Sequence, residues 1–282
     1  MSYVARPMPP KDPGVDTSQN HYWTYHQLPT LLGCKQPVTA SQDEDLFIAV
    51  HQVCEISFHQ MILDLDRTLD ALRAGIDAEA GRIGDLREAA YFLTRVNQFW
   101  RTVNATMPIL SGMRAFAEFR TALGPTSGFQ SWQFRRIEIM SGVRQRYWTG
   151  GTADATGKVH VAESEFDRHY GAQVEAWFDQ YQANNLKSHA QTLIGIAGDK
   201  TPSPRAFLEA HPEAGPVVRL MAAYDRAQLA FHRAHLQLAV VQLTRVGVEI
   251  GTGGTSYRDY LATYEAQLAP LLPEFAGAED EG

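Results

Sequence analysis

The chain has 282 residues and a formal net charge of −7, without a block of like charges. This balance argues against a nucleic-acid or anionic-membrane partner and favours a small-molecule partner. The length suits one large domain with a sizeable core. Cys34 and Cys54 are too few for a disulfide framework or a cysteine metal cluster, and they suit a reducing compartment. No apolar run approaches the roughly 20 residues that span a bilayer, and the N-terminus lacks a signal-peptide core, so we expect a cytoplasmic protein.

The N-terminal part of the chain predicts an arm followed by a long helix. The first 20 residues are rich in Pro and Asp, and the aromatic-rich segment HYWTYHQLPTLLG predicts a short helix that ends near Gly33. Ser41 and Glu44 have the spacing of a capping box. Apolar residues then recur at helical spacing as far as Leu72, which predicts a long helix.

The middle of the chain continues the helical pattern. A second long helix is expected from about Leu86 to Met107. The stretch GPTSGFQSWQFRRIE at 124–138 begins as a turn and becomes helical, with Arg135 and Glu138 spaced to attract each other on one helix surface. The polar, Gly-rich stretch 142–160 predicts a surface loop with room for a short hairpin. Helical spacing returns near Ser164.

The C-terminal third predicts one more long helix. Four prolines between 202 and 216 punctuate a connection, and the helix that follows ends at Gly247. A glycine-rich loop, EIGTGGTS, leads to an expected terminal helix from Tyr257 to about Leu272. Alternating strand patterns do not accumulate, so the predicted fold class is all-α.

Two histidines lie inside long apolar helices. His51 shares a helix face with Phe47, and His235 shares one with Phe231. Taken singly, each is more often a hydrogen-bonded core histidine than a ligand. Together they suit a haem site, in which one imidazole ligates iron and the opposite side is open for oxygen chemistry. The chain has no CxxCH, so such a haem is held non-covalently.

Other candidate motifs carry less information when taken alone. His232 and His235 form HRAH, but no carboxylate lies at a spacing that completes a metal site. GTGGTS at 251–256 lacks the lysine of a P-loop and the preceding strand of a dinucleotide fold, so it is either a flexible connection or a loop that turns hydroxyl and N–H groups toward a ligand. Arg120 is either a solvated helix charge or a bidentate partner for a carboxylate.

Four blocks in this order resemble the tryptophan 2,3-dioxygenase family and its haem-dependent aromatic oxygenase relatives: LFIAVHQVCEISFHQ, FAEFRTALGPTSGFQSWQFRRIE, HRAHLQLAVVQ and GTGGTS. The resemblance starts at YWTYHQL and reaches about residue 272. It implies a helical bundle that encloses haem b and acts on tryptophan, or a derivative of it, together with O2. It also implies a homotetramer, in which an arm of residues 1–40 contributes to a neighbouring subunit's site and residues 41–282 form the oxygenase domain.

The resemblance also implies roles for single residues. His235 matches the axial ligand of the haem iron, and His51 matches the distal histidine that faces the indole N–H. Arg120 matches the arginine that binds the substrate carboxylate. The remaining matches are to substrate-binding positions: Phe47, Phe116 and Leu123 around the indole, Thr126 and Ser127 in the loop over the pocket, Thr252 near the ammonium group, and Tyr22 and Tyr25 as tyrosines given to a neighbouring subunit.

The sequence departs from the family pattern after His51. The run Val53 to Ser57 replaces one in which most members carry a large aromatic residue, and His26 replaces a leucine. The interval from His235 to Thr252 is also about three residues longer than in typical members. Two reaction outcomes therefore stay open: insertion of both oxygen atoms to give N-formylkynurenine, or delivery of one to give an oxindole-type product in a specialised pathway. A haem-binding sensor or carrier and a non-haem structural helical protein are the alternatives from other classes.

Overall fold

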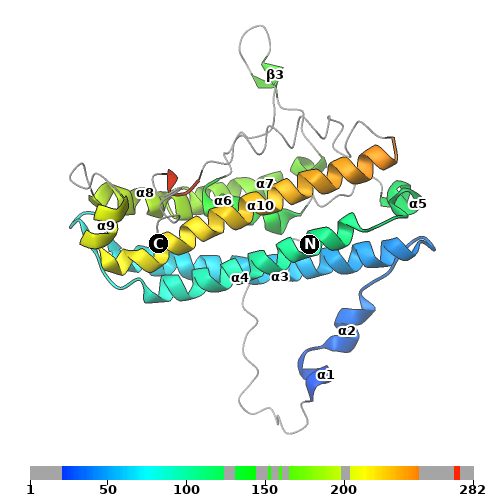
Figure 1. Cartoon of the computed structure of the whole chain (residues 1–282), viewed down its shortest axis with the longest axis horizontal. Coiled ribbons are helices and arrows are strands. Elements are labelled where there is room, and N and C mark those ends of the chain that lie inside the picture. Colours follow the sequence, from blue (N-terminus) through cyan, green and yellow to red (C-terminus); the bar gives the residue numbers. More distant parts are fainter. Residues whose placement is uncertain are drawn as a thin grey trace.

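The computed structural model describes residues 21–123, 131–143, 152–153, 159–160, 165–197, 204–247 and 270–273. Regular structure in these ranges is almost entirely helical, which confirms the all-α prediction. Three long helices lie side by side along the longest axis of the molecule (Figure 1): α3 (Gln42–Gly75), α4 (Arg87–Ser111) and α10 (Gly215–Arg245). Helix α4 runs antiparallel to α3 and parallel to α10 (Figure 1).

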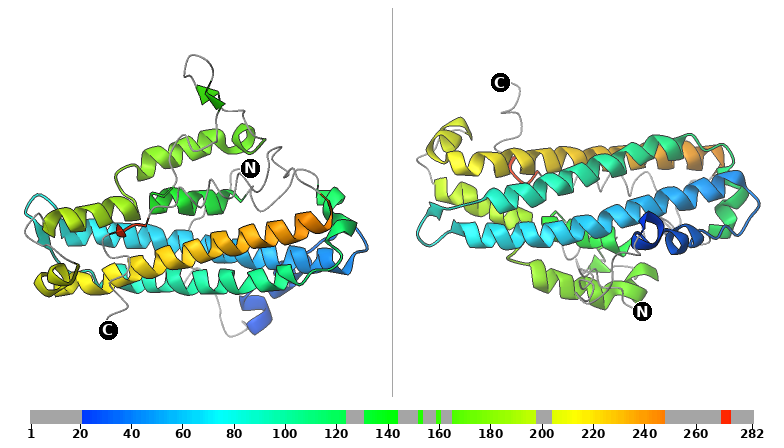
Figure 2. Two further views of the ribbon diagram at one scale, coloured as in Figure 1. Left: turned by 45° about the horizontal axis from the view of Figure 1, so that its top comes forward. Right: turned by 90° about the horizontal axis from the view of Figure 1, so that it is seen from below.

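Shorter elements surround these three helices. They are α1 (Tyr22–Tyr25), α2 (Leu28–Gly33), α5 (Phe116–Phe119), the 3-10 helix η1 (Arg120–Leu123), α6 (Trp132–Ser141), α7 (Glu165–Tyr181), α8 (Leu186–Ala197), α9 (Pro204–Ala210) and the 3-10 helix η3 (Pro212–Ala214). Helices α6, α7 and α8 lie on one side of the long helices, whereas α1 and α2 lie on the other side, away from the bundle (Figures 1 and 2).

The strands in the described part of the chain form two short antiparallel hairpins. In the turn between α3 and α4, β1 (Ile76–Asp77) pairs with β2 (Arg82–Ile83). Between α6 and α7, β3 (Thr152–Ala153) pairs with β4 (Val159–His160). The second hairpin falls in the Gly-rich stretch for which the sequence allowed one.

The core is centred on four aromatic side chains, each from a different helix. Phe58 of α3, Trp100 of α4, Phe134 of α6 and Phe231 of α10 contact one another, with ring centroids 5.2–6.4 Å apart for all six pairs. All four are buried, and Trp100 is completely so. Large aromatic side chains supply much of the apolar area that a core removes from water, so this aromatic cluster fixes how the four helices pack.

Helix α3 begins differently from the predicted capping box. Ser41 is the N-cap residue, but its side chain makes no capping hydrogen bond. The Glu44 carboxylate instead accepts hydrogen bonds from the backbone N–H groups of Val38 (2.9 Å) and Thr39 (2.7 Å). The chain before the helix bends back over the first turn, so Glu44 stabilises that bend and the capping-box prediction was wrong.

Helix α3 is also long and apolar enough to cross a membrane by length and composition. In this fold it is a core helix that packs along α4 and α6. Its buried Asp64 forms ion pairs with Arg67 (2.9 Å) and Arg95 of α4 (3.1 Å). A buried carboxylate with two arginine partners is typical of a protein interior.

Other predicted helices begin or end a few residues from the expected position, and one predicted helix is divided into two. The aromatic segment forms two short helices, because Gln27 adopts a left-handed conformation with φ of 54° between α1 and α2. The proline-rich connection contains α9, which begins at Pro204, where a missing N–H costs nothing. Most of the expected terminal helix lies outside the described residues, and its last part, 270–272, is not helical.

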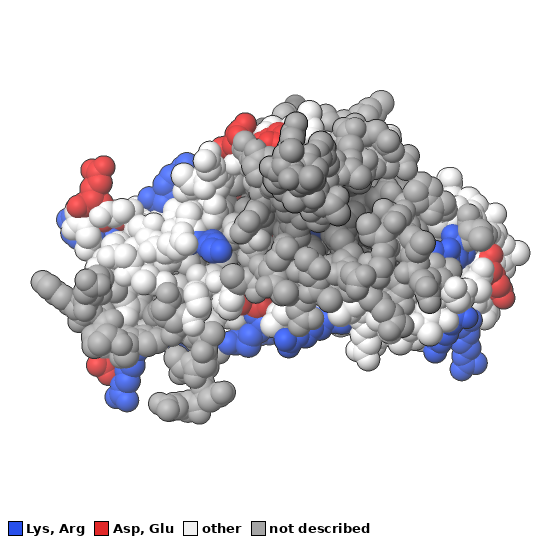
Figure 3. All heavy atoms as spheres, turned by 90° about the horizontal axis from the view of Figure 1, so that it is seen from above, with Lys and Arg blue, Asp and Glu red and all other residues white. Residues whose placement is uncertain are grey.

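The described surface carries charges of both signs. Figure 3 shows Lys and Arg side chains interspersed with Asp and Glu side chains around one face of the molecule.

Candidate functional site

His51 lies on the N-terminal half of α3, half-buried, with its ring orientation set by its own helix. Its Nδ1 is 2.8 Å from the carbonyl oxygen of Phe47. A carbonyl oxygen can only accept, so Nδ1 carries the hydrogen and Nε2 keeps a free lone pair. Burial lowers the pKa of His51, while the Phe47 carbonyl and the charge of Glu55 act in the opposite direction. The neutral ring therefore presents a hydrogen-bond acceptor.

His235 lies on α10, with its ring stacked on Phe231. The ring centroids are 5.9 Å apart and the planes differ by 17°. Burial, the charge of His51 and the charge of Arg135 lower the pKa of His235 to about 4. A protonated His51 thus acts electrostatically on His235. At neutral pH both imidazoles are uncharged.

His232 is the second histidine of the HRAH segment and lies one turn before His235. Its ring packs edge-on against Phe134 (5.6 Å) and Phe231 (5.8 Å). Burial, followed by the charges of His235 and Arg135, lowers its pKa to about 3. His232 therefore packs against the aromatic cluster.

An apolar wall lies beside His51. The ring of Phe47 is 4.0 Å from that of His51 and 6.4 Å from that of Phe116. Phe119, which the sequence reading did not single out, is completely buried 5.5 Å from Phe47 and 5.4 Å from Phe116. Leu123, at the end of η1, packs against the core.

The segment that carries Phe116 and Arg120 is fastened to α3. The Asp43 carboxylate accepts hydrogen bonds from the backbone N–H groups of Arg114 (2.7 Å) and Ala115 (2.6 Å). These groups immediately precede α5, so the bonds place α5 and η1 at the His51 end of α3. The Nε atom of Arg120 is buried and has no hydrogen-bond partner in the described part of the chain. A buried guanidinium N–H that lacks a partner is costly, so this atom is a candidate to bind an anionic ligand.

Of the remaining predicted site residues, some lie outside the described part of the chain and the others lie on α1. Thr126, Ser127 and Thr252 lie outside the described residues. Tyr22 and Tyr25 lie on α1 and are 69% and 62% exposed, each ring packing edge-on against His26. Helix α1 lies outside the bundle of its own chain (Figure 1).

In the run Val53 to Ser57, which departs from the family pattern, most of the altered side chains lie on other faces of α3 than His51. Val53 and Ile56 are exposed, and Ser57 is buried with its hydroxyl donating to the Val53 carbonyl (2.7 Å). A residue six positions after His51 lies on another face of an α-helix, whereas Glu55, four positions after it, lies on the same face. Loss of an aromatic side chain at position 57 therefore leaves the face of His51 unaltered.

Comparison with known proteins identifies a family. The sequence profile described as tryptophan 2,3-dioxygenase matches residues 11–191. The tryptophan 2,3-dioxygenase of a Nocardioides species is 38% identical, over 92% of this chain and 94% of the relative. The one from Anaeromyxobacter dehalogenans is 37% identical, over 93% and 96%, and the one from Rhodococcus jostii is 27% identical, over 96% and 95%.

The chain belongs to the tryptophan 2,3-dioxygenase family. Members of this family are haem-dependent oxygenases, so the protein is an oxygenase with haem b as its cofactor. The residues present fit that cofactor. His235 is neutral at physiological pH, and its ring nitrogens make no hydrogen bond in the described part of the chain. A neutral imidazole with a free nitrogen is the form that binds iron.

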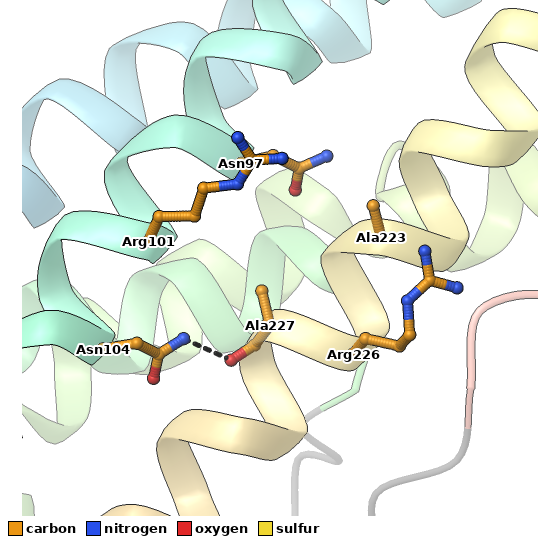
Figure 4. Close-up of a pocket in the computed structure, with 6 residues that line it drawn as sticks. All are labelled: Asn97, Arg101, Asn104, Ala223, Arg226 and Ala227. Carbon is orange, nitrogen blue, oxygen red and sulfur yellow. Dashed lines mark hydrogen bonds between the residues drawn. The ribbon is translucent and has the colours of Figure 1, made fainter.

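The protein also has a groove that is lined by none of the predicted site residues. It has a volume of about 420 Å³ and lies between α4 and α10 (Figure 4). Asn97 and Asn104 bridge the two helices by donating to the carbonyls of Leu220 (2.9 Å) and Ala227 (2.9 Å). The residues that line the groove are Asn97, Arg101, Asn104, Ala223, Arg226 and Ala227. It is separate from the histidine pair.

Proposed function

We propose that the protein inserts both atoms of O2 across the C2–C3 bond of the indole of L-tryptophan, which gives N-formylkynurenine. The observation that carries the proposal is the pair of neutral histidines, His51 on α3 and His235 on α10, within electrostatic range of each other. Relatives that match nearly the whole chain bear the name tryptophan 2,3-dioxygenase, which favours insertion of both atoms over one.

In this proposal His235 holds the haem. The Nε2 or Nδ1 lone pair of its neutral ring binds the iron, and stacking on Phe231 fixes the plane of the imidazole. When bound, haem b supplies the iron centre that activates O2. The aromatic cluster, of which Phe231 is a member, holds α10 in place and excludes water from this side of the site.

His51 orients the substrate. Its Nδ1–H is committed to the Phe47 carbonyl, so Nε2 accepts a hydrogen bond from the indole N–H. This bond fixes one edge of the indole, while Phe47, Phe116 and Leu123 contact its apolar faces. The contribution of the protein is mainly to position the indole and to exclude water.

Arg120 binds the amino-acid end of the substrate. Its buried and unpartnered Nε supports this role, because a guanidinium pairs with a carboxylate through two charge-assisted hydrogen bonds. Thr126 and Ser127 cover the pocket and Thr252 contacts the ammonium group, by their match to the family motifs.

The N-terminal arm completes the site of a neighbouring subunit. Tyr22 and Tyr25 expose most of their ring surface, and Trp23 beside them is 54% exposed. Adjacent exposed aromatic side chains on a short helix away from the bundle favour contact with another protein surface. We therefore propose a homotetramer in which the arm, residues 1–40, is donated to the oxygenase domain, 41–282, of a partner. The free thiols of Cys34 and Cys54 favour a cytoplasmic location.

Mass spectrometry of the product made from tryptophan under ¹⁸O2 tests the proposal. Dioxygenation predicts N-formylkynurenine that carries two labelled oxygen atoms. An oxindole-type product with one labelled atom would show that the enzyme is a monooxygenase. A haem protein whose absorption spectrum is indifferent to tryptophan, and which forms no product, would show that it is a sensor or carrier.

A further inference from the structure

A hydrogen-bonded tie joins α6 to α3 next to His51. The side-chain Nε2 of Gln133 donates to the Glu55 carboxylate (2.7 Å) and to the main-chain carbonyl of Glu55 (2.9 Å). Gln133 is buried and lies in the first turn of α6, which begins at the N-cap Ser131. One glutamine amide therefore fixes both the backbone and the carboxylate of Glu55.

The tie places a negative charge beside the distal histidine. Glu55 follows His51 by one helical turn, so the two residues lie on the same face of α3. Its charge acts on the imidazole in the sense that favours a positive ring, against the effect of burial.

We infer that Glu55, held by Gln133, is a positioning residue that strengthens His51 as the acceptor of the substrate's indole N–H. This inference rests on the proposed function, in which His51 faces that group. An imidazole gains partial positive charge when its Nε2 accepts a hydrogen bond, and a nearby carboxylate stabilises that charge. The orientation of His51 by Phe47 and its basicity by Glu55 are thus separate contributions from one helix face.

Cationic side chains lie on other elements of this region. Arg135 on α6 acts on His235, which is uncharged at neutral pH, and Arg120 lies on η1. The charge of Glu55 raises the pKa of His51, so its removal leaves His51 a weaker acceptor.

The test compares two ligands that differ at one atom. L-Tryptophan and its benzofuran analogue, in which oxygen replaces the indole N–H, are titrated into the ferric haem protein and followed by the Soret band. Glu55→Gln removes the charge and keeps an oxygen that accepts from Gln133. We expect tryptophan affinity to fall roughly twofold, less than on complete loss of a hydrogen bond worth about 0.5–1.5 kcal/mol, with little change for the analogue.

Controls separate this effect from a structural one. Glu88→Gln removes an exposed carboxylate from the start of α4 and should leave both affinities unchanged. Equal weakening of both ligands by Glu55→Gln, or no weakening of either, would overturn the inference. If the wild-type protein itself does not prefer tryptophan over the analogue, the role of His51 in the proposed function fails instead.

A second variant decides the matter if Glu55→Gln does not fold. Gln133→Met removes the donor but keeps the carboxylate, so the charge is no longer fixed; we expect a smaller loss, again selective for tryptophan. Equal loss for both ligands would show that the tie only supports the fold. NMR titration of His51 in the haem-free protein is independent of ligand binding: its pKa should fall in Glu55→Gln, and an unchanged value contradicts the inference.

Discussion

The ring of His235 lies nearly parallel to that of Phe231, which precedes His235 by one turn on α10. Phe231 is itself fixed by the aromatic cluster, where it contacts Phe134 (5.2 Å) and Trp100 (5.6 Å). The plane of the imidazole is therefore held by the packing of four helices. Such second-layer contacts orient a metal ligand before the metal binds.

The first prediction concerns His235, the proposed ligand of the haem iron. His235→Ala should abolish stoichiometric haem binding and leave the helical fold, because the helices around the site remain packed. The Soret absorbance per protein chain measures the first effect, and far-UV circular dichroism measures the second.

His232→Ala is the matched control, because His232 is also a buried histidine with a strongly lowered pKa on α10. It should retain the Soret band. A normal Soret band in His235→Ala together with its loss in His232→Ala would reassign the iron ligand to His232.

A second prediction concerns the distal side. His51→Ala should keep the haem and part of the activity, because in the proposed function His51 orients the substrate and is not an obligatory base. Loss of one neutral hydrogen bond costs about 0.5–1.5 kcal/mol, or roughly twofold to tenfold in kcat/KM. Steady-state kinetics on tryptophan measures this loss. If the variant no longer binds haem, the roles of His51 and His235 are reversed.

Most of the helices and both histidine faces could be predicted from sequence. The spacing of Phe47 and His51, and of Phe231 and His235, is a local property of one helix, and both pairs are in ring contact. The ion pair of Arg135 and Glu138 was also expected, at 2.8 Å. It is almost completely buried, however, because α6 is covered on all sides, and burial depends on neighbours that one helix does not reveal.

Contacts between distant segments could not be predicted from one sequence. Gln133 and Glu55 are separated by 78 positions, and neither belongs to a sequence motif that predicts its hydrogen-bond partner. Likewise, nothing local to Asp43 signals that it binds the backbone before α5. These contacts depend on which helices are neighbours in the folded protein, and the local sequence pattern does not specify that.

A third prediction tests the aromatic cluster. Phe134→Ala should lower the free energy of unfolding by about 3–5 kcal/mol, because it removes a buried ring that contacts three other helices and leaves a cavity. Tyr91→Ala, at a 55% exposed position on α4, should change it by about 0.5 kcal/mol or less. Chemical denaturation of the haem-free proteins measures both. Similar losses in the two variants would contradict a central role for the cluster.

A fourth prediction follows from Asp225 on α10. Its carboxylate accepts a hydrogen bond from the backbone N–H of Leu271 (2.8 Å), and burial raises its pKa to about 7, although Leu271, Leu272, Arg226 and Lys187 favour the charged form. The folded state therefore binds a proton more tightly than the unfolded state. This group's contribution to stability falls as the pH rises from about 4 to about 7.

The buried histidines with lowered pKa values make the stability rise with pH over the same range, opposite to Asp225. Comparison of the wild type with Asp225→Asn isolates the contribution of Asp225, because the histidines are the same in both proteins. The amide oxygen still accepts from Leu271 but carries no charge. The variant should be more stable than the wild type at pH 8 and about equally stable near pH 4. Thermal melts across this range measure the difference; a difference that is constant with pH contradicts the prediction.

The last prediction tests whether the substrate is an amino acid. Arg120 offers a planar guanidinium that pairs with a carboxylate through two hydrogen bonds, whereas lysine offers a point charge without that geometry. Arg120→Lys should therefore weaken tryptophan binding. Arg120→Ala leaves the carboxylate buried and unpaired, a penalty of about 2–5 kcal/mol, or roughly 30-fold to several-thousand-fold in affinity.

The loss in the Arg120 variants should be selective, and spectral titration with indole is the control. Indole has no carboxylate, and in the proposed site it contacts His51 and the apolar wall of Phe47, Phe116 and Leu123, so its affinity should change little. Equal weakening of both ligands would mean that Arg120 only supports η1, which the Asp43 bonds already hold against α3. If neither ligand weakens, the carboxylate binds elsewhere, and the unpartnered Nε of Arg120 has another role. Selective loss for tryptophan alone would tie the guanidinium of Arg120 to the substrate carboxylate.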